Sequence, residues 1–360
     1  MASRLVPGMK ASLTAARVNS VCDALQTRIQ LSDAELRKLM LRAPNLVCCN
    51  VENNLLPSVE ALQERLGLSS EELRKTLVGH PPLLGLSVED NVLPSLNALQ
   101  DRLGLSNAEL RKIMLRSPTV VGLNMEENVL PSLAALQDRL GLSGAELRKV
   151  VLGRPSLMGY SVEANVLPSL AVLQSRLALS DAELRKVVMG RSTLLGLSME
   201  ANVLPSLAAL QSRLALSDAE LKRMVVRLPT LLGTSMEGNV LPSLAALQAR
   251  LELSDVELKQ VVVRHPGIMS LSFDANLAPK LDWLQRELRL SSDELRAKVL
   301  ASPARLGASL TRRYRPRLKA CRLAGAHDMI VLNRWSLKDS AFCQLIGVSE
   351  DVLEACREEE

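Results

Sequence analysis

The sequence predicts an all-α protein, an α-solenoid formed as a superhelix of eight 37-residue helix-turn-helix repeats, each followed by a short 3₁₀ turn. Three observations predict this class. Near-identical segments begin at Asn165, Asn202 and Asn239, and prolines and Ser-x-x-Glu pairs recur with the same period of 37 residues. A single helical hairpin of this length cannot bury its own apolar face, whereas stacked hairpins bury one continuous core.

Two proline series and one serine series define the repeats. The leading prolines are Pro57, Pro94, Pro131, Pro168, Pro205, Pro242, Pro279 and Pro316. The second series is Pro44, Pro81, Pro118, Pro155, Pro229, Pro266 and Pro303, with Ser192 in the remaining place. The serines, each followed three residues later by glutamate, are Ser32, Ser69, Ser106, Ser143, Ser180, Ser217, Ser254 and Ser291. Eight repeats are therefore predicted over residues 20–315, without insertions.

The third repeat shows how each element is predicted. Pro94 is tolerated in the first turn of a helix, where its missing N–H has no partner, and leucines follow it at helical spacing. Ser106 and Glu109 form a capping box that begins a second helix. That helix must end before Pro118, because the residue before a proline avoids the helical region. The next few residues are too few for an α-helix and predict a 3₁₀ turn.

The two ends of the chain differ from the repeats. Residues 1–19 are basic, contain serines and lack acidic residues, which predicts either a transit-peptide remnant or an ordinary frayed terminus. Residues 316–360 predict a degenerate C-terminal cap with an acidic tail.

The composition limits the classes of function. The chain has a net charge of +5, which permits an anionic partner without requiring one, and it has no uncharged apolar stretch long enough for a membrane span. The six cysteines lack metal-ligand spacing, which predicts a reducing compartment without disulfides. The serines and glutamates are explained by capping, and no phosphate-binding loop or zinc motif occurs. The sequence therefore predicts no enzyme activity, no cofactor and no metal.

Cations recur on the polar strip of the second helix of each repeat, represented by Lys112 and Arg116. A helical wheel places both residues opposite the apolar arc. Stacked repeats would align them as a ladder that suits phosphates. These primary nucleic-acid-binding candidates are Lys38, Arg42, Lys75, Lys112, Arg116, Lys149, Lys186, Arg223, Arg227 and Arg264.

Two further arginine series have a structural alternative. One lies within the apolar arc of the second helix, and its secondary candidates are Arg37, Arg74, Arg111, Arg148 and Arg185. The other closes the first helix and comprises Arg28, Arg65, Arg102, Arg139, Arg176, Arg213 and Arg250. Such arginines can bind phosphates, or they can form salt bridges between repeats and complement helix dipoles.

The densest basic cluster is "TRRYRPRLKACR", which contains Arg312, Arg313, Arg315 and Arg317. It predicts a phosphate clamp at the end of the solenoid, with a solvated C-terminal cap as the alternative.

The repeat P-x-L-x-x-L-x-x-R-L-G-L-S-x-x-E-L-R-K, followed by R-x-P-x-L-L-G-L-S, resembles that of the mitochondrial transcription termination factor (mTERF) family. The tail, including Phe342, resembles the closing segment of that family. The resemblance implies a left-handed superhelix that holds a nucleic-acid duplex along a basic inner groove. It also implies work in mitochondria or chloroplasts, in transcription termination or in organelle gene expression more broadly.

The residues favour duplex DNA as the partner. Single-strand binders stack bases on aromatic side chains, but only six aromatic residues occur here and none recurs with the repeat. The repeats are too uniform for a one-base-per-repeat RNA code. Structured RNA and a protein-interaction scaffold remain alternatives, and a monomer without membrane association is expected.

Overall fold

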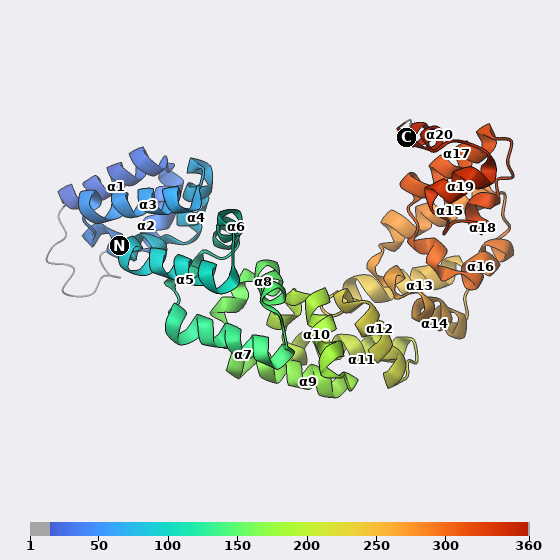
Figure 1. Ribbon diagram of the computed structural model, residues 1–360, viewed down its shortest axis with the longest axis horizontal. Helices are drawn as coiled ribbons and strands as arrows, with labels where there is room; N and C mark the ends of the chain where they lie inside the picture. Colours follow the sequence, from blue (N-terminus) through green and yellow to red (C-terminus); the bar gives the residue numbers. More distant parts are fainter. Residues whose placement is uncertain (1–14, 359–360) are drawn as a thin grey trace. The chain divides into compact units, whose positions relative to one another are not determined.

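The computed structural model describes residues 15–358, and this range is helical with connecting turns and contains no β-strand (Figure 1). The predicted all-α solenoid is confirmed. The helices are α1 (Ala15–Ile29), α2 (Asp33–Arg42), α3 (Leu56–Leu66), α4 (Ser70–Gly79), α5 (Leu93–Leu103), α6 (Asn107–Arg116), α7 (Leu130–Leu140), α8 (Gly144–Gly153), α9 (Leu167–Leu177), α10 (Asp181–Gly190), α11 (Leu204–Arg213), α12 (Asp218–Arg227), α13 (Leu241–Arg250), α14 (Asp255–Arg264), α15 (Ala278–Glu287), α16 (Ser292–Ala301), α17 (Arg315–Leu323), α18 (Ile330–Asn333), α19 (Asp339–Ile346) and α20 (Glu350–Glu358).

The chain forms two compact units. Among the described residues, unit 1 contains 15–174 together with 180–196, and unit 2 contains 175–179 and 197–358. The first 14 residues of the predicted N-terminal segment 1–19 lie outside the described residues, and the rest of that segment begins α1. No helix within residues 15–358 is long and apolar enough to cross a membrane.

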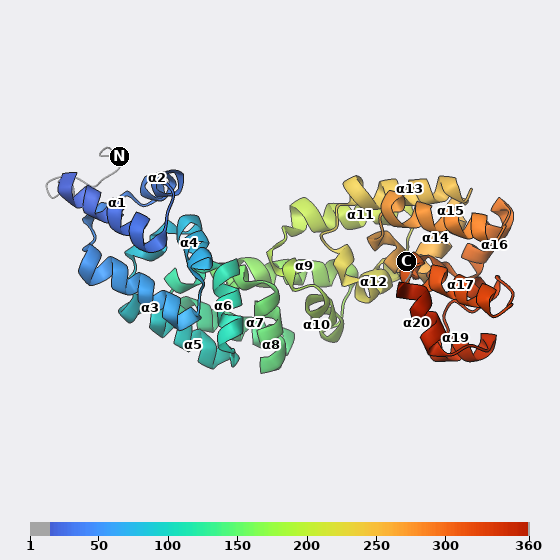
Figure 2. The same cartoon turned by 90° about the horizontal axis from the view of Figure 1, so that it is seen from above.

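Each repeat contributes a first helix, the A helix (odd-numbered α1 to α15), and a second helix, the B helix (even-numbered α2 to α16). In unit 1 the B helices α6, α8 and α10 contact one another in order, and the A helices α3, α5 and α7 each pack on the B helix of the next repeat (Figure 2). Leu110, Ile113 and Met114 of α6 are almost completely buried between these layers. The core is therefore aliphatic, as the composition requires.

The predicted capping box is present at the start of all eight B helices. In α6 the Ser106 hydroxyl accepts a hydrogen bond from the Glu109 backbone N–H, and the Glu109 carboxylate accepts one from the Ser106 backbone N–H. The same reciprocal pair begins α2, α4, α8, α10, α12, α14 and α16. These bonds satisfy two backbone donors that a helix start would leave unpaired.

The predicted 3₁₀ turns follow every B helix. They span Pro44–Cys48, Pro81–Gly85, Pro118–Gly122, Pro155–Gly159, Ser192–Gly196, Pro229–Leu231, Pro266–Ser270 and Pro303–Gly307.

A π-helical turn before the leading proline was not predicted. These π-turns span Val51–Leu55, Val88–Val92, Met125–Val129, Val162–Val166, Met199–Val203, Met236–Val240, Phe273–Leu277 and Leu310–Tyr314. In the third repeat, Ser87 caps the turn, and the Val92 backbone N–H donates to the Ser87 carbonyl at 3.2 Å. Because Pro94 has no N–H, the α-helical bond from this position is absent, and the wider turn occurs where that bond is missing. The helical backbone therefore begins one turn before the proline at which the helix was predicted to start.

The turn between A and B helices forces one residue into the left-handed conformation in all eight repeats. The position is glycine in three repeats, at Gly67, Gly104 and Gly141, with φ near +60°. In the other five it is occupied by Gln30, Ala178, Ala215, Glu252 and Arg289, with φ between +45° and +55°. A residue with a Cβ costs roughly 1–2 kcal/mol in this conformation.

Glycine at these positions is expected to stabilise the protein. Ala178→Gly and Ala215→Gly should each raise the free energy of unfolding by about 1 kcal/mol, because they remove the left-handed strain. Gly141→Ala should lower it by a similar amount; a Cβ there meets no atom within 4 Å, so strain alone would act. Denaturant unfolding measures the free energy of unfolding of all three variants. A loss of stability in Ala178→Gly would contradict this account.

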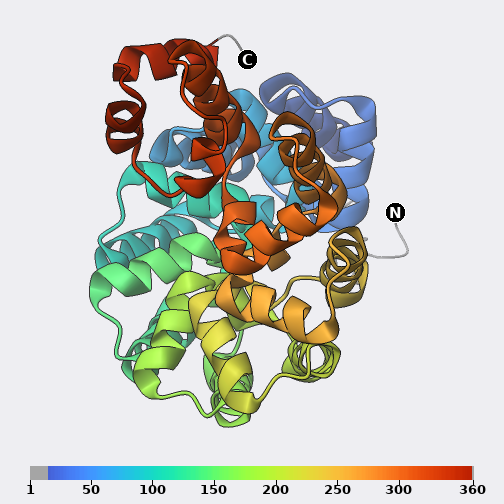
Figure 3. The same cartoon turned by 90° about the vertical axis from the view of Figure 1, so that its right-hand side faces the viewer.

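The C-terminal segment extends the repeat pattern by one helix. Helix α17 follows a π-turn and carries Pro316 in its first turn, as A helices do. Helix α20 packs on α17, and α19 packs on α20 (Figures 2 and 3). The division between repeats at 20–315 and a cap at 316–360 stays a prediction.

Candidate nucleic-acid interface

The cations at the Arg111 position join neighbouring repeats. Arg148 Nη2 lies 2.5 Å from Oε2 of Glu109, the capping-box carboxylate of the preceding repeat. The same spacing of 39 residues pairs Arg74 with Glu35, Arg111 with Glu72, Arg185 with Glu146, Lys259 with Glu220, and Arg296 with Glu257. The alternative of salt bridges between repeats is confirmed for this series.

The secondary candidates therefore have a structural role. Four of them pair with a carboxylate of the preceding repeat, namely Arg74, Arg111, Arg148 and Arg185. Their charge is therefore already neutralised within the fold, whereas the prediction of phosphate binding required an unpaired cation. Arg37 is exposed in the first repeat, where no capping box precedes it within the described residues.

The capping glutamates are held in their charged form. Hydrogen bonds from Ser106, followed by one from Arg148, lower the pKa of Glu109 to about 2. Arg185, followed by Ser143, lowers the pKa of Glu146 to about 2. Glu220 and Glu257 also have pKa values lowered to about 2. These carboxylates are therefore ionised near neutral pH, where they accept the hydrogen bonds of the capping boxes and pair with cations of the next repeat.

Acid is expected to loosen the stack of repeats. The pKa of these glutamates is lower in the folded chain than the ordinary value of 4.5. Their stabilising contribution is therefore complete above that value and is lost as the pH falls from about 4.5 toward 2. Denaturant unfolding at pH 7, 4 and 3 should show this loss, and Glu146→Gln should show a smaller dependence on pH. Equal pH dependence in the variant and the wild type would refute the linkage.

The arginines that close the A helices also bridge repeats. Arg139 Nη1 lies 3.1 Å from Asp181 Oδ1, and its Nη2 donates to Gln174. Ion pairs with the same 42-residue spacing join Arg176 to Asp218 and Arg213 to Asp255, whereas Arg250 pairs with Asp282 on the next A helix, α15. This series connects consecutive repeats in both units.

Three of the primary candidates cap the next B helix. Arg116 Nη1 donates to the Leu152 carbonyl at 3.0 Å, near the end of α8, and Arg264 Nη1 donates to the Leu300 carbonyl at 3.0 Å. Arg42 makes a longer bond of the same kind, 3.5 Å, to the Gly79 carbonyl. The last carbonyls of a helix lack internal donors, and a cation beside them complements the helix dipole. These arginines are exposed, but part of their hydrogen-bonding capacity is used within the fold.

The cations at the Lys112 position remain available. We name as the lysine row the five exposed lysines of α2, α4, α6, α8 and α10 in unit 1, which are Lys38, Lys75, Lys112, Lys149 and Lys186. Within residues 15–358, Lys112, Lys149 and Lys186 have neither a hydrogen-bond partner nor an ion-pair partner. Lys75 pairs with Glu71 on its own helix at 2.6 Å, with both side chains mostly exposed. Such exposed pairs contribute little and are easily exchanged for another anion.

The same position in unit 2 loses its charge. It is Arg223 on α12, which is exposed, then Gln260 on α14 and Ala297 on α16. Arg227, one turn after Arg223, is also exposed. Unit 2 therefore carries a much shorter row of cations on its B helices.

An acidic series lies on the π-turns and was not recognised in the sequence. One exposed carboxylate begins each of the first seven π-turns, namely Glu52, Glu89, Glu126, Glu163, Glu200, Glu237 and Asp274. An anion at a helix start complements the helix dipole. The small net charge of +5 therefore includes two separate series of opposite sign, unpaired cations on B helices and carboxylates on π-turns.

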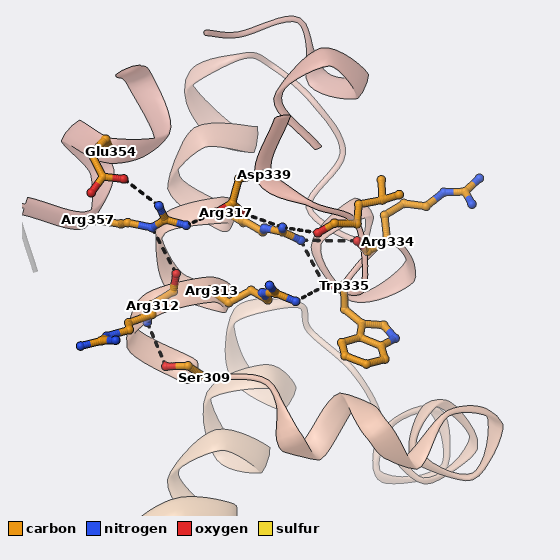
Figure 4. A network of polar contacts seen from close by, with 10 residues as sticks. Ser309, Arg312, Arg313, Arg317, Arg334, Trp335, Asp339, Glu354 and Arg357 are labelled. Atoms are coloured by element: carbon orange, nitrogen blue, oxygen red, sulfur yellow. Dashed lines mark hydrogen bonds and ion pairs between the residues drawn. The ribbon is translucent and has the colours of Figure 1, made fainter. Parts of the chain in front are cut away.

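Unit 2 contains a basic cavity of about 920 Å³ beside α17. Four arginines line it, which are Arg312, Arg313, Arg315 and Arg357, together with Trp335, His265 and Glu354. Figure 4 shows the network of hydrogen bonds and ion pairs around Arg312, Arg313 and Arg357. Arg313 Nη1 donates to the Trp335 carbonyl at 3.2 Å, and Arg357 contacts Asp339 at 2.5 Å and Glu354 at 2.7 Å.

The prediction that Arg317 belongs to the phosphate clamp is wrong. Arg317 is fully buried, and its guanidinium donates to the carbonyls of Trp335 and Leu337 and to Asp339. It also lies over the Phe342 ring, 4.4 Å from the centroid. Arg317 lies on α17 one helical turn after Arg313, on the face that packs against the cap, and both guanidinium groups donate to the Trp335 carbonyl, so Arg317 ties the loop around Trp335 to α17. Arg312, Arg313 and Arg315 remain at the cavity wall.

The sequence did not reveal four of these cavity residues. His265 comes from the end of α14, Trp335 from the loop after α18, and both Glu354 and Arg357 from α20. The repeat period gives no signal for Trp335 or Arg357, because both follow the last repeat, and His265 is one variant of a helix-end position. Within the described residues, no group of three or more side chains could hold a metal ion.

Comparison with protein families gives a match along most of the chain. The mTERF family model matches residues 8–102, 90–213 and 202–342. No curated protein matches the sequence. The matched regions include every A and B helix and most of the C-terminal cap. The repeat motif, the stacked helix pairs and this match establish that the chain belongs to the mTERF family, whose nucleic-acid-binding repeat proteins act in organelle gene expression.

Proposed function

We propose that this protein binds duplex DNA through the phosphate backbone, with the lysine row of unit 1 as its main contact. The observation that carries the proposal is that Lys112, Lys149 and Lys186 are exposed and unpaired within the described residues, whereas the neighbouring arginine series are used between repeats. An interaction surface needs charge that the fold does not already neutralise.

The length of the lysine row suits a duplex. Packed helices lie roughly 8–10 Å apart, so five consecutive B helices would span about 32–40 Å. One turn of B-DNA is about 34 Å long. The row would follow the backbone over about one turn, and the acidic π-turns would disfavour contact at their own edge.

Few features would read the base sequence. Arginine and lysine contacts to phosphates position a protein without specifying bases. The lysine row is uniform, and the described residues of unit 1 include only one aromatic side chain, Tyr160. We propose that the chain acts by occupying the duplex in a mitochondrion or chloroplast and thereby obstructing or positioning a polymerase, which includes transcription termination. It would do so as a monomer.

A salt titration tests this function. Fluorescence anisotropy of a random-sequence DNA duplex should give a plot of log affinity against log salt with a slope of about −4 to −5, because each neutralised phosphate contributes about −0.9. An RNA duplex of equal length, measured in parallel, tests the structured-RNA alternative and should bind more weakly. The absence of binding at 50 mM salt, or a flat slope, would contradict the proposal and favour a protein-interaction scaffold.

A further inference from the structure

The cavity beside α17 has a composition that phosphate-backbone binding by the lysine row does not explain. Four guanidinium groups and one carboxylate line it, so its wall carries a net excess of three positive charges without His265. The carboxylate is Glu354, which is paired with Arg357 Nη1 at 2.7 Å. The wall therefore presents cations to an anion from at least two segments, the π-turn at Leu310–Tyr314 and helix α20.

Arg312 is the cation best placed to bind a ligand. Its side chain is exposed and lines the cavity, and its guanidinium has no partner within residues 15–358. Its backbone is fixed on both sides, because its N–H donates to the Ser309 hydroxyl at 3.1 Å and its carbonyl accepts from Arg357 Nε at 3.3 Å. A guanidinium on a fixed backbone can bind a phosphate through two parallel hydrogen bonds.

Trp335 supplies an aromatic surface in the same cavity. Its carbonyl is held by Arg313 Nη1 and Arg317 Nη1, both at 3.2 Å. Its half-buried indole has no ring contact or hydrogen bond among the described residues. In Figure 4 the Arg312 guanidinium and the Trp335 indole lie at opposite ends of the network, with Arg313 between them. The cavity thus offers a cationic end and an aromatic end.

We infer that this cavity binds a nucleoside 5′-phosphate moiety, with Arg312 on the phosphate and Trp335 stacked on the base. A phosphate monoester carries about −1.5 to −2 charges at pH 7, which matches the excess of cations. The cavity volume of about 920 Å³ lies in the usual range for small-ligand sites. The moiety can be a free nucleotide or the terminal nucleotide of a nucleic-acid strand, and only the second source rests on the function proposed above.

Calorimetry of the full chain with adenosine 5′-monophosphate tests this inference. Saturable binding is expected, and Arg312→Gln and Trp335→Ala should each weaken it at least about tenfold, which is the scale of one charged contact or one stacked base. Adenosine and inorganic phosphate should each bind more weakly than the nucleotide. Arg286→Gln is the matched control, since Arg286 is exposed on α15 and does not line the cavity.

Two results would overturn the assignment. One is nucleotide binding that neither Arg312→Gln nor Trp335→Ala changes. The other is inorganic phosphate that binds as tightly as the nucleotide, with no effect of Trp335→Ala. Circular dichroism of each variant confirms that the fold is retained.

The two proposals fail separately. Neutralising the lysine row should abolish tight duplex binding and leave nucleotide binding unchanged, whereas Arg312→Gln should weaken nucleotide binding and leave the binding of a 5′-hydroxyl duplex unchanged. Duplexes with 5′-phosphate and 5′-hydroxyl ends distinguish the two sources. An advantage of the phosphorylated end that Arg312→Gln removes identifies a strand end as the source. Equal binding of the two duplexes, together with tight nucleotide binding, identifies a free nucleotide.

Discussion

Replacing Lys112, Lys149 and Lys186 together by glutamine is expected to weaken the binding of a random-sequence DNA duplex by roughly several hundredfold at 0.1 M salt. Each phosphate contact contributes about 0.9 log units of affinity per tenfold decrease in salt. Because 0.1 M salt lies one decade below a 1 M reference, the loss of three contacts lowers the affinity by about 2.7 log units. The fold should tolerate the change, because Gln260 occupies the same position in the seventh repeat. Fluorescence anisotropy measures the affinity of the variant.

A triple variant with the same change in net charge provides the control. Arg286, Arg289 and Arg334 are exposed in unit 2, and none of them belongs to the lysine row or lines the basic cavity. Glutamine is already found as Gln30 at the repeat position of Arg289. If this control loses as much affinity as the lysine variant, net charge governs binding and the lysine row has no special role.

Arg317→Met is expected to lower the stability of the C-terminal cap by about 3 kcal/mol, the lower end of the cost of removing one partner of a buried ion pair, because Asp339 is partly exposed and keeps Arg357 as a partner. The substitution leaves Asp339 with only one of its two arginine partners, leaves the Leu337 carbonyl without its arginine donor, and leaves the Trp335 carbonyl with Arg313 alone. Arg317→Lys should restore only part of the stability, because an ammonium lacks the planar set of donors. Hydrogen exchange of α17 to α20 measures the effect.

Arg312→Gln is the matched comparison for this buried arginine. The Arg312 side chain is exposed, so its loss should change stability by no more than about 0.5 kcal/mol. Equal stability of the Arg317→Met and Arg312→Gln variants would show that the buried network does not hold the cap together.

The periodic features of the fold could be predicted because each has a local cause. Ser106 with Glu109 predicts a helix start, and Pro118 predicts a helix end followed by a 3₁₀ turn, from rules that involve only a few neighbouring residues. The π-turn at Val88–Val92 was missed, because a proline in a first turn is compatible with a helix that starts at the proline as well as with one that starts earlier. The left-handed position was also missed, because only three of its eight occupants are glycine.

The candidate interface was less predictable, because pairing between repeats depends on three-dimensional stacking. A wheel places Arg111 beside apolar residues, but only the packed repeats show that Glu72 lies 2.5 Å away. Lys112 and Arg116 share one helical strip, yet the end of the next B helix is within reach of Arg116 and not of Lys112. The basic cavity joins segments of the cap with no common period, so Trp335 and Arg357 carried no signal in the sequence.

The most direct test of the central claim compares the salt dependence of duplex binding for the wild type and for the Lys112→Gln, Lys149→Gln, Lys186→Gln variant. If these lysines each neutralise one phosphate, the slope of log affinity against log salt should become less negative by about 2.7. Identical slopes for the two proteins would show that the lysines do not contact phosphates, even if the affinity of the variant were lower.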